Sequence, residues 1–395
     1  MRLALALLTS LATASLAAPA MAQFDFYTAS APEIAGGRPG TVIRTETLNG
    51  TPDGATAYRM LYRSVGLDGK PIAVSGVAII PSGPVPPGGR PIVAWAHPTT
   101  GVQPQCGPSR SGGIFQSIQG LRAMLAKGYV VAATDYAGLG APGPHPYLVG
   151  SSEGRAVIDS VRAARALPNA AAGKRFTVWG HSQGGHAALF TGILAKRVAP
   201  ELELVGVAAA APATELATLL EDDIDTDGGR NLTAMTLWSW TRVYKAPLDK
   251  IVAAPAVPIV DALAADCIES LSDILRRLRP TEALERRFLT DERFAARQPW
   301  RGLLARNTPG PLPASVPVYI AQGTSDTLVR PQVTRDYANS LCRAGSPVRF
   351  DALEGVGHLP AAENSADTAV DWMEERFLGK PPASNCENAV RKPAR

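Results

Sequence analysis

The segment that decides the fold runs Arg175-Phe-Thr-Val-Trp-Gly-His-Ser-Gln-Gly-Gly185. Its first part, Arg175 to Trp179, is a short apolar run typical of a buried strand, and the residues after Gly185 are typical of a helix. Between them stands Gly-x-Ser-x-Gly, centred on Ser182. This motif alone is a weak signal, because Gly and Ser are common in turns. Between a strand and a helix, it predicts a tight turn that lifts the Ser182 hydroxyl off the sheet edge as a nucleophile. A plain turn is the alternative.

The residues around Ser182 have separate expected roles. Gly180 and Gly184 fit the turn because it leaves no room for a side chain there. The backbone N–H of Gln183 begins the following helix, so we expect it to face the negative charge that develops on a reacting carbonyl oxygen.

Further apolar runs on both sides of this segment predict a mostly parallel sheet covered by helices on both faces. Such runs are short and apolar throughout, as in strands buried on two sides. The expected strands are 58–65, 72–80, 91–96, 129–134, 175–179, 204–209, 316–321 and 348–352, with helices at 113–126, 152–167 and 331–341.

The strand signal disappears between Ala213 and Asn307. Helices are expected there at 216–220, 232–243, 259–278 and 281–289, with a proline-broken linker at 253–258. Inserted between two core strands, this block indicates a helical cap, or lid, rather than more sheet. Its Met235, Leu237, Trp238 and Trp240 either line an acyl channel or form the small core of the insertion. The expected organisation is core 23–212, cap 213–307 and core 308–395.

A serine nucleophile needs a base, and the base needs an orienting carboxylate. Asp326 and His358 each follow a predicted strand, at the carboxyl edge where α/β sites form. The chain order Ser182, Asp326, His358 is the order of the α/β-hydrolase arrangement. Asp351 and Glu354 are the fallback acids, although both lie close to His358 in the sequence.

The other four histidines have weaker claims. His181 and His186 are interpreted as packing or polar core residues, His97 as structural, and His145 as a loop residue near the site entrance. The loop after His97 supplies the second oxyanion donor in this fold, and its first candidate is the backbone N–H of Thr99, with Thr100 second. No ligand spacing for zinc or another metal is present, and the expected chemistry needs no cofactor.

The start of the chain is typical of a signal peptide. An apolar run from Leu3 to Ala18 follows Arg2, and Ala20-Met-Ala22 gives the small-residue pattern of a cleavage site. We therefore expect cleavage of residues 1–22 after Ala22 and a secreted or periplasmic product, with a retained membrane anchor as the alternative. The net charge of +4 is spread along 395 residues and gives no argument for nucleic acid.

Export changes the interpretation of the four cysteines. An even count in an oxidising compartment favours two disulfides, with three possible pairings. We favour Cys106–Cys267 and Cys342–Cys386, because the second bond would tie the tail to the last part of the core.

The motifs together resemble the secretory lipase family, the fungal lipase A-type enzymes and their bacterial relatives. The resemblance rests on the helical insertion and on five segments, which are His97-Pro-Thr-Thr-Gly101, Asp135-Tyr-Ala-Gly-Leu-Gly140, Gly180–Gly185, Gly323-Thr-Ser-Asp326 and Gly355-Val-Gly-His358. It implies a triad of Ser182, Asp326 and His358 beneath a lid. Pro98 departs from the glycine that many relatives carry, which affects the second oxyanion donor.

The expected function is hydrolysis of carboxylic esters, as in a lipase or esterase, through an acyl-enzyme on Ser182. We expect an ester or lipid substrate and a monomer. A small-ester or antibiotic-ester hydrolase, a serine peptidase and an acyltransferase are alternatives on the same core. A non-catalytic binding module that kept the fold is the alternative from another class.

Overall fold

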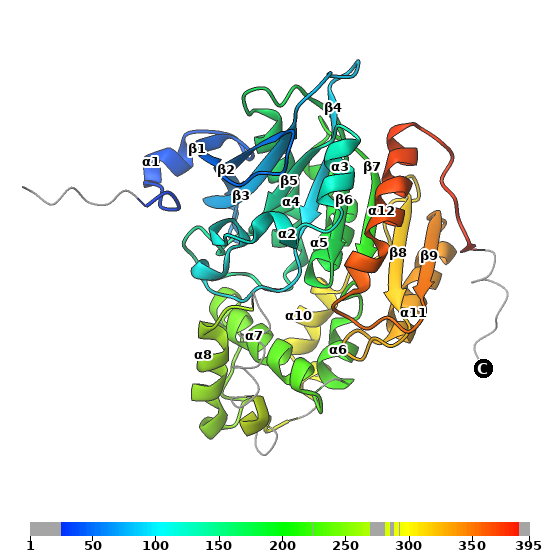
Figure 1. The fold of residues 1–395 in the computed structure, drawn as a ribbon. Helices are drawn as coiled ribbons and strands as arrows, with labels where there is room; N and C mark the ends of the chain where they lie inside the picture. The colour runs from blue at the N-terminus through cyan, green and yellow to red at the C-terminus, as the bar shows by residue number, and fades with distance from the viewer. Residues whose placement is uncertain (1–24, 223, 269–280, 285–287, 292, 387–395) are drawn as a thin grey trace, which may run out of the picture.

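The computed structural model describes residues 25–222, 224–268, 281–284, 288–291 and 293–386. The predicted leader with its cleavage site after Ala22 lies outside the described residues, as does most of the second half of the helix expected at 259–278. Figure 1 shows a twisted sheet with helices on both faces and a helical block beyond one end of the strands. Within the described part of the chain, no helix is long and apolar enough to cross a membrane.

The sheet has nine strands among the described residues, in the order β1-β2-β3-β5-β4-β6-β7-β8-β9. The first three pairings are antiparallel and the remaining ones parallel, which confirms the mostly parallel sheet. The strands are β1 Val42–Leu48, β2 Ala55–Val65, β3 Pro71–Pro81, β4 Arg90–Ala96, β5 Val130–Thr134, β6 Ala172–His181, β7 Glu203–Ala210, β8 Val318–Gly323 and β9 Val348–Leu353.

Alternate residues of each central strand serve two separate cores. On β4, Ile92 and Ala94 face one core, while Val93 and Trp95 face the other. Helices α4 (Gly150–Arg165), α5 (Gln183–Val198) and α11 (Pro331–Arg343) cover the first face. Helices α2 (Ile114–Ser117), α3 (Leu121–Ala126) and α12 (Ala361–Phe377) cover the second. Burial on both faces explains why the central parts of these strands are largely apolar at successive positions.

Three elements differ from the sequence-based expectation. The helix expected at 113–126 is two short helices, because Gly120 between them has a φ of 79°. Strand β1 was not expected: it is a half-exposed edge strand with polar and charged residues, so it lacks the apolar signal. Helix α12 was also missed, although its Trp372 and Met373 are fully buried against the sheet.

Residues 213–307, which lie between β7 and β8, are called the insertion below. Its helices are α6 Leu216–Asp222, α7 Asp227–Val243, α8 Val257–Ala265 and α10 Trp300–Asn307. Instead of the linker expected at 253–258, a short 3₁₀ turn leads directly into α8. Met235, Leu237, Trp238 and Trp240 lie in the core of the insertion, where Trp240 stacks on Trp300 with ring centroids 6.1 Å apart. These residues therefore form part of the core of the insertion and do not line the cavity beside Ser182.

Two disulfides join Cys106 to Cys267 and Cys342 to Cys386. The first ties the insertion to the loop after β4. The second holds the tail along the edge strand β9, where Asn385 also donates its backbone N–H to the Val348 oxygen over 3.0 Å. The tail therefore covers part of an otherwise open sheet edge.

Replacing both Cys342 and Cys386 with Ala should lower the free energy of unfolding by up to about 4 kcal/mol, because the bond closes a loop of 44 residues in the unfolded chain. Urea unfolding of the oxidised parent and the double variant measures the difference. An unchanged midpoint would show that the tail is held by its hydrogen bonds alone.

Candidate active site

The turn between β6 and α5 holds Ser182 in a strained conformation, with φ 56° and ψ −117°. A Cβ at Gly180 would lie 2.2 Å from the Gly184 oxygen, and one at Gly184 would lie 1.9 Å from the Ala96 oxygen. Both positions therefore require glycine, as the sequence predicts. The Ser182 N–H donates to the Ala210 oxygen on β7 over 2.9 Å. Close packing on β4 and this bond to β7 hold the strained turn, which costs of order 1–3 kcal/mol by itself.

Three side chains distant in sequence meet at the carboxyl ends of the strands. Ser182 Oγ lies 2.9 Å from His358 Nε2, and His358 Nδ1 lies 2.8 Å from Asp326 Oδ2. Asp326 and His358 occupy the loops after β8 and β9. The structure thus brings together the three residues predicted as nucleophile, acid and base. This is the geometry of a serine activated by an oriented imidazole.

The Asp326 carboxylate is buried but stays ionised. Burial would raise its pKa, yet the hydrogen bond and charge of His358 and the backbone N–H groups of Val329 and Leu328 lower it below the usual value. Those two N–H groups donate to Oδ1 over 2.8 and 2.9 Å. The Gln322 amide donates to Oδ2 over 3.0 Å. Gln322 was not predicted from the sequence, because a strand residue carries no motif.

His181 holds the backbone of His358. Its Nε2–H donates to the backbone oxygen of His358 over 3.0 Å, and the two rings are 5.1 Å apart. Burial, followed by the neighbouring His358, lowers the pKa of His181 to about 3. A neutral ring at this point holds the His358 backbone without adding a charge beside it.

A buried polar network lies behind Gln183, the residue after the nucleophile. The Gln183 amide nitrogen donates to Glu153 Oε1 over 2.8 Å and to His145 Nε2 over 3.0 Å. Glu153 Oε2 lies 2.7 Å from His186 Nδ1, and His186 Nε2–H donates to the Asn307 oxygen at the end of α10 over 2.7 Å. The network therefore links α4, α5 and the insertion.

The network changes the expectation for His145 and adds Glu153, which was not predicted. His145 is not at the site entrance: it is fully buried, and burial lowers its pKa to about 4. Glu153 was missed because an acid in a helix is most simply a surface residue. The only sequence hint is that Glu153 lies in the first turn of α4, beside apolar positions.

The loop after β4 is held from both sides. His97 is buried with its ring nitrogens 2.6 Å from the Pro98 oxygen and 3.3 Å from the Asp135 oxygen, so it is structural as expected. Tyr147 pairs its hydroxyl with the hydroxyl of Thr99 over 2.9 Å. The Thr100 oxygen accepts from the N–H of Ile268 in the segment after α8.

Asp135 itself is a structural anchor. Its carboxylate accepts from the Ser109 N–H over 2.8 Å and from the Ser75 hydroxyl over 2.6 Å, which fixes the segment around Cys106. Of the fallback acids, Asp351 pairs with Arg349, and Glu354 is exposed, so neither replaces Asp326 beside His358.

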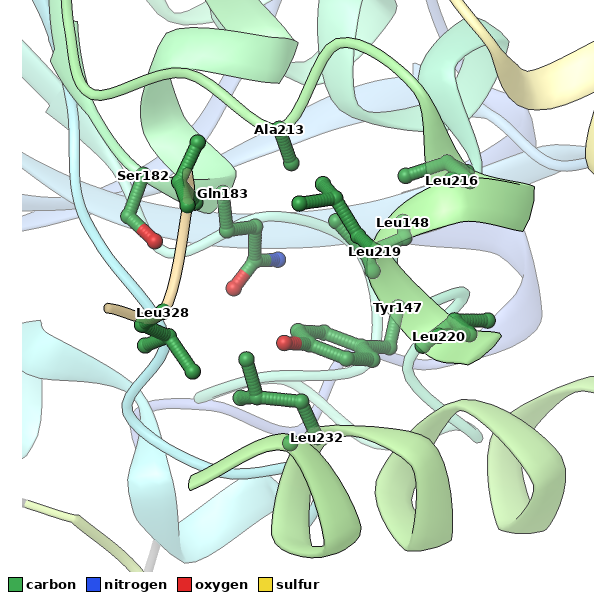
Figure 2. A pocket seen from close by; sticks show the side chains of 12 residues that line it. Tyr147, Leu148, Ser182, Gln183, Ala213, Leu216, Leu219, Leu220, Leu232 and Leu328 are labelled. Atoms are coloured by element: carbon green, nitrogen blue, oxygen red, sulfur yellow. The ribbon is translucent and has the colours of Figure 1, made fainter. Parts of the chain in front are cut away.

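A small cavity of about 30 Å³ lies beside Ser182 (Figure 2). That volume holds about two water molecules. Apart from Ser182, Gln183, Tyr147 and Gly229, its lining is aliphatic, and comes mainly from α6, α7 and the loop after β8: Leu148, Ala213, Leu216, Leu219, Leu220, Leu232, Leu328 and Val329. The insertion thus covers Ser182, whose residue surface is only 9% exposed.

The sheet topology, the strained serine turn and the Ser182–His358–Asp326 geometry define a serine hydrolase of the α/β-hydrolase fold. Residues 117–385 match the family described as secretory lipase, and the chain belongs to that family.

Individual relatives agree with this assignment. The chain is 25% identical to a secreted triacylglycerol lipase, LIP7, of Malassezia globosa, over 89% of this chain and 78% of that protein. It is 24% identical to a probable inactive lipase of Mycobacterium tuberculosis, over 87% of this chain and 79% of that protein. The crystal structure of Candida antarctica lipase A has the same fold, with a TM-score of 0.78 at 19% identity over 94% of this chain and 89% of that one.

Replacing His181 with Gln should flatten the pH dependence of stability. The unfolded histidine, with a pKa near 6.5, takes up a proton as the pH falls, whereas the folded one, with a pKa of about 3, does not. Stability is therefore lost from about pH 6.5 downwards, and His181 accounts for about 2 kcal/mol between pH 7 and pH 5. Urea unfolding of parent and variant at both pH values measures this difference. Equal losses in the two proteins would contradict it.

Proposed function

We propose that this protein hydrolyses carboxylic esters through an acyl-enzyme on Ser182, with His358 as base and Asp326 as the orienting acid. The observation that carries the proposal is the unbroken chain of contacts from Ser182 Oγ to His358 Nε2 and from His358 Nδ1 to Asp326. One relative is described as a probable inactive lipase, so family membership alone does not establish activity. The proposal therefore depends on these contacts.

The geometry supports one direction of proton transfer. With the Nδ1–H of His358 donated to Asp326, Nε2 carries the lone pair that takes the Ser182 proton as Oγ attacks the ester carbonyl. The imidazolium that forms lies beside an ionised carboxylate, which stabilises it. His358 then protonates the leaving alcohol, and a water activated by the same nitrogen releases the acid.

The developing oxyanion would be held by the backbone N–H groups of Gln183 and Thr99. Gln183 begins α5, so its N–H and the helix N-terminus both favour negative charge. Thr99 is supported by its fixed position, since its side chain is bonded to Tyr147. A donor at such a position stabilises the transition state by about 3 kcal/mol.

We further propose that residues 213–307 act as a lid between the two core segments 23–212 and 308–395. Helices α6 and α7 line the cavity beside Ser182, and the cavity is too small for an acyl chain. Substrate entry therefore requires these helices to move. The lid stays attached at the Cys106–Cys267 bond and at the network ending on Asn307.

We also infer that the chain is exported, with residues 1–22 removed after Ala22. The family is described as secretory, and a relative is a secreted lipase. The two disulfides suit an oxidising compartment, either the periplasm or the medium.

Replacing Ser182 with Ala should lower kcat for a 4-nitrophenyl ester by about 10⁶-fold and abolish labelling by a fluorophosphonate. Asp326→Asn should cost up to about 10⁴-fold, whereas the matched change Asp351→Asn should cost little. Ester, amide and alcohol-acceptor reactions run side by side distinguish an esterase from a peptidase or acyltransferase. More than a tenth of the activity in Ser182→Ala would remove Ser182 as nucleophile.

The aliphatic lining should favour medium or longer acyl esters over acetate, because each buried methylene contributes about 0.8 kcal/mol, or nearly fourfold in kcat/KM. Leu219→Ala, which widens the lining on α6, should raise kcat/KM for decanoate more than for acetate. Leu263→Ala, in the insertion core and outside the lining, is the matched control and should leave that preference unchanged. A series in which acetate is the best substrate would indicate a small-ester hydrolase.

A further inference from the structure

The cavity beside Ser182 is lined by a polar atom that the proposed mechanism does not use and that has no hydrogen bond to the described part of the protein. Gln183 is 1% exposed, and its amide oxygen Oε1 is buried with no hydrogen-bond partner among the described protein groups. In Figure 2 this oxygen points into the space between Leu328 and the hydroxyl end of the Tyr147 ring, and that hydroxyl pairs with Thr99 over 2.9 Å. The surrounding side chains from α6 and α7 are leucines, which offer it no donor.

The orientation of the amide is fixed by its other end. The Nδ1 atom of His145 lies 2.8 Å from the Ala137 oxygen, which can only accept, so Nδ1 carries the ring proton and Nε2 is an acceptor. The Gln183 nitrogen therefore donates one hydrogen to His145 Nε2 and the other to Glu153 Oε1. Turning the amide over would place its oxygen against two acceptors, so Oε1 must face the cavity.

Glu153 and His145 cannot easily move to release the amide. Glu153 is 1% exposed and also accepts the Leu148 N–H over 3.0 Å and faces His186 over 2.7 Å. His145 is fully buried, and its Nδ1–H donates to the Ala137 oxygen over 2.8 Å, a contact outside the insertion. The acceptor is thus preorganised before any substrate enters.

We propose that Gln183 Oε1 is a specificity determinant that selects esters whose buried half carries one hydroxyl group. This inference rests on the proposed function of Ser182. A hydroxyl within reach of Oε1 would donate to it, while the rest of the acyl or alcohol group packs on the leucines. An ester without that hydroxyl leaves a buried acceptor unsatisfied, which opposes binding in the transition state as well as the ground state.

The test compares matched ester pairs with the parent enzyme. For the acyl half, 4-nitrophenyl esters of 2- and 3-hydroxybutyrate are compared with butyrate. For the alcohol half, the 1,3-propanediol monobutyrate is compared with propyl butyrate. Each kcat/KM is divided by the hydroxide-catalysed rate constant, which removes differences in intrinsic reactivity. We expect at least one hydroxylated ester to be favoured by roughly tenfold to a hundredfold.

The Gln183→Met variant should bring that ratio close to one, because the acceptor is gone. Leu220→Met, an apolar change in the same lining, should keep the parent ratio. If Gln183→Met does not fold, Gln183→Asn withdraws the same groups by one methylene and should also lower the ratio. The ratio is the decisive quantity, since damage to the network would slow both members of a pair.

The outcomes separate this inference from the proposed function. Ratios near or below one for every pair in the active parent would overturn the role of Oε1 and indicate that solvent satisfies it. A ratio that survives in both Gln183 variants would also overturn it. Loss of hydrolysis of all esters, with no fluorophosphonate labelling, would instead contradict the role of Ser182.

Discussion

The close approach of the Ser182 turn to the end of β4 is the constraint on which the site depends. A Cβ at Gly184 would lie 1.9 Å from the Ala96 oxygen, so α5 begins in direct contact with the backbone of a neighbouring strand. This contact leaves Ser182 at a φ of 56°, a conformation that an unsupported chain would leave. The same approach places Ser182 Oγ at the carboxyl edge of the sheet, where the loops after β8 and β9 deliver Asp326 and His358 (Figure 1).

Around this turn, several buried polar groups are paired with other protein groups. His181 holds the backbone of His358, Gln322 and two N–H groups hold Asp326, and Glu153 holds the side chain after the nucleophile. Such paired networks fix side-chain directions more tightly than apolar packing does. The one amide oxygen left facing the cavity is therefore conspicuous: the bonds that fix its nitrogen also fix where it points.

The insertion contributes cover and apolar surface, and its aromatic residues pack in a cluster that also includes Tyr147 and Val149 of the core. Trp240 and Trp300 stack inside it, while the leucines of α6 and α7 face Ser182. Its links to the rest of the chain include the Cys106–Cys267 disulfide, the hydrogen bond from Ile268 to Thr100 and the hydrogen bond from His186 to the Asn307 oxygen. Two of these bear on the loop that carries Thr99 and Thr100. Movement of the insertion would therefore act on that loop as well as on access to Ser182.

The sequence alone determined the parallel sheet, the serine turn and the triad candidates, because these depend on local signals. Apolar runs mark strands buried on both faces, and paired glycines mark a turn with no room for a Cβ. Edge strand β1 was missed because an exposed edge needs no apolar pattern, and Gln322 because a strand residue carries no motif. Glu153 was missed because its partners Gln183 and His186 lie far along the chain. Only the tertiary structure decided three other features. They are the bond from Gln183 to His145, the burial of Trp238 in the insertion core and the direction of the Gln183 amide. Each depends on which groups meet in a buried space, and hydrogen-bond partners 30 to 121 residues apart, such as Gln183 with Glu153 or His186 with Asn307, leave no spacing for a sequence to display.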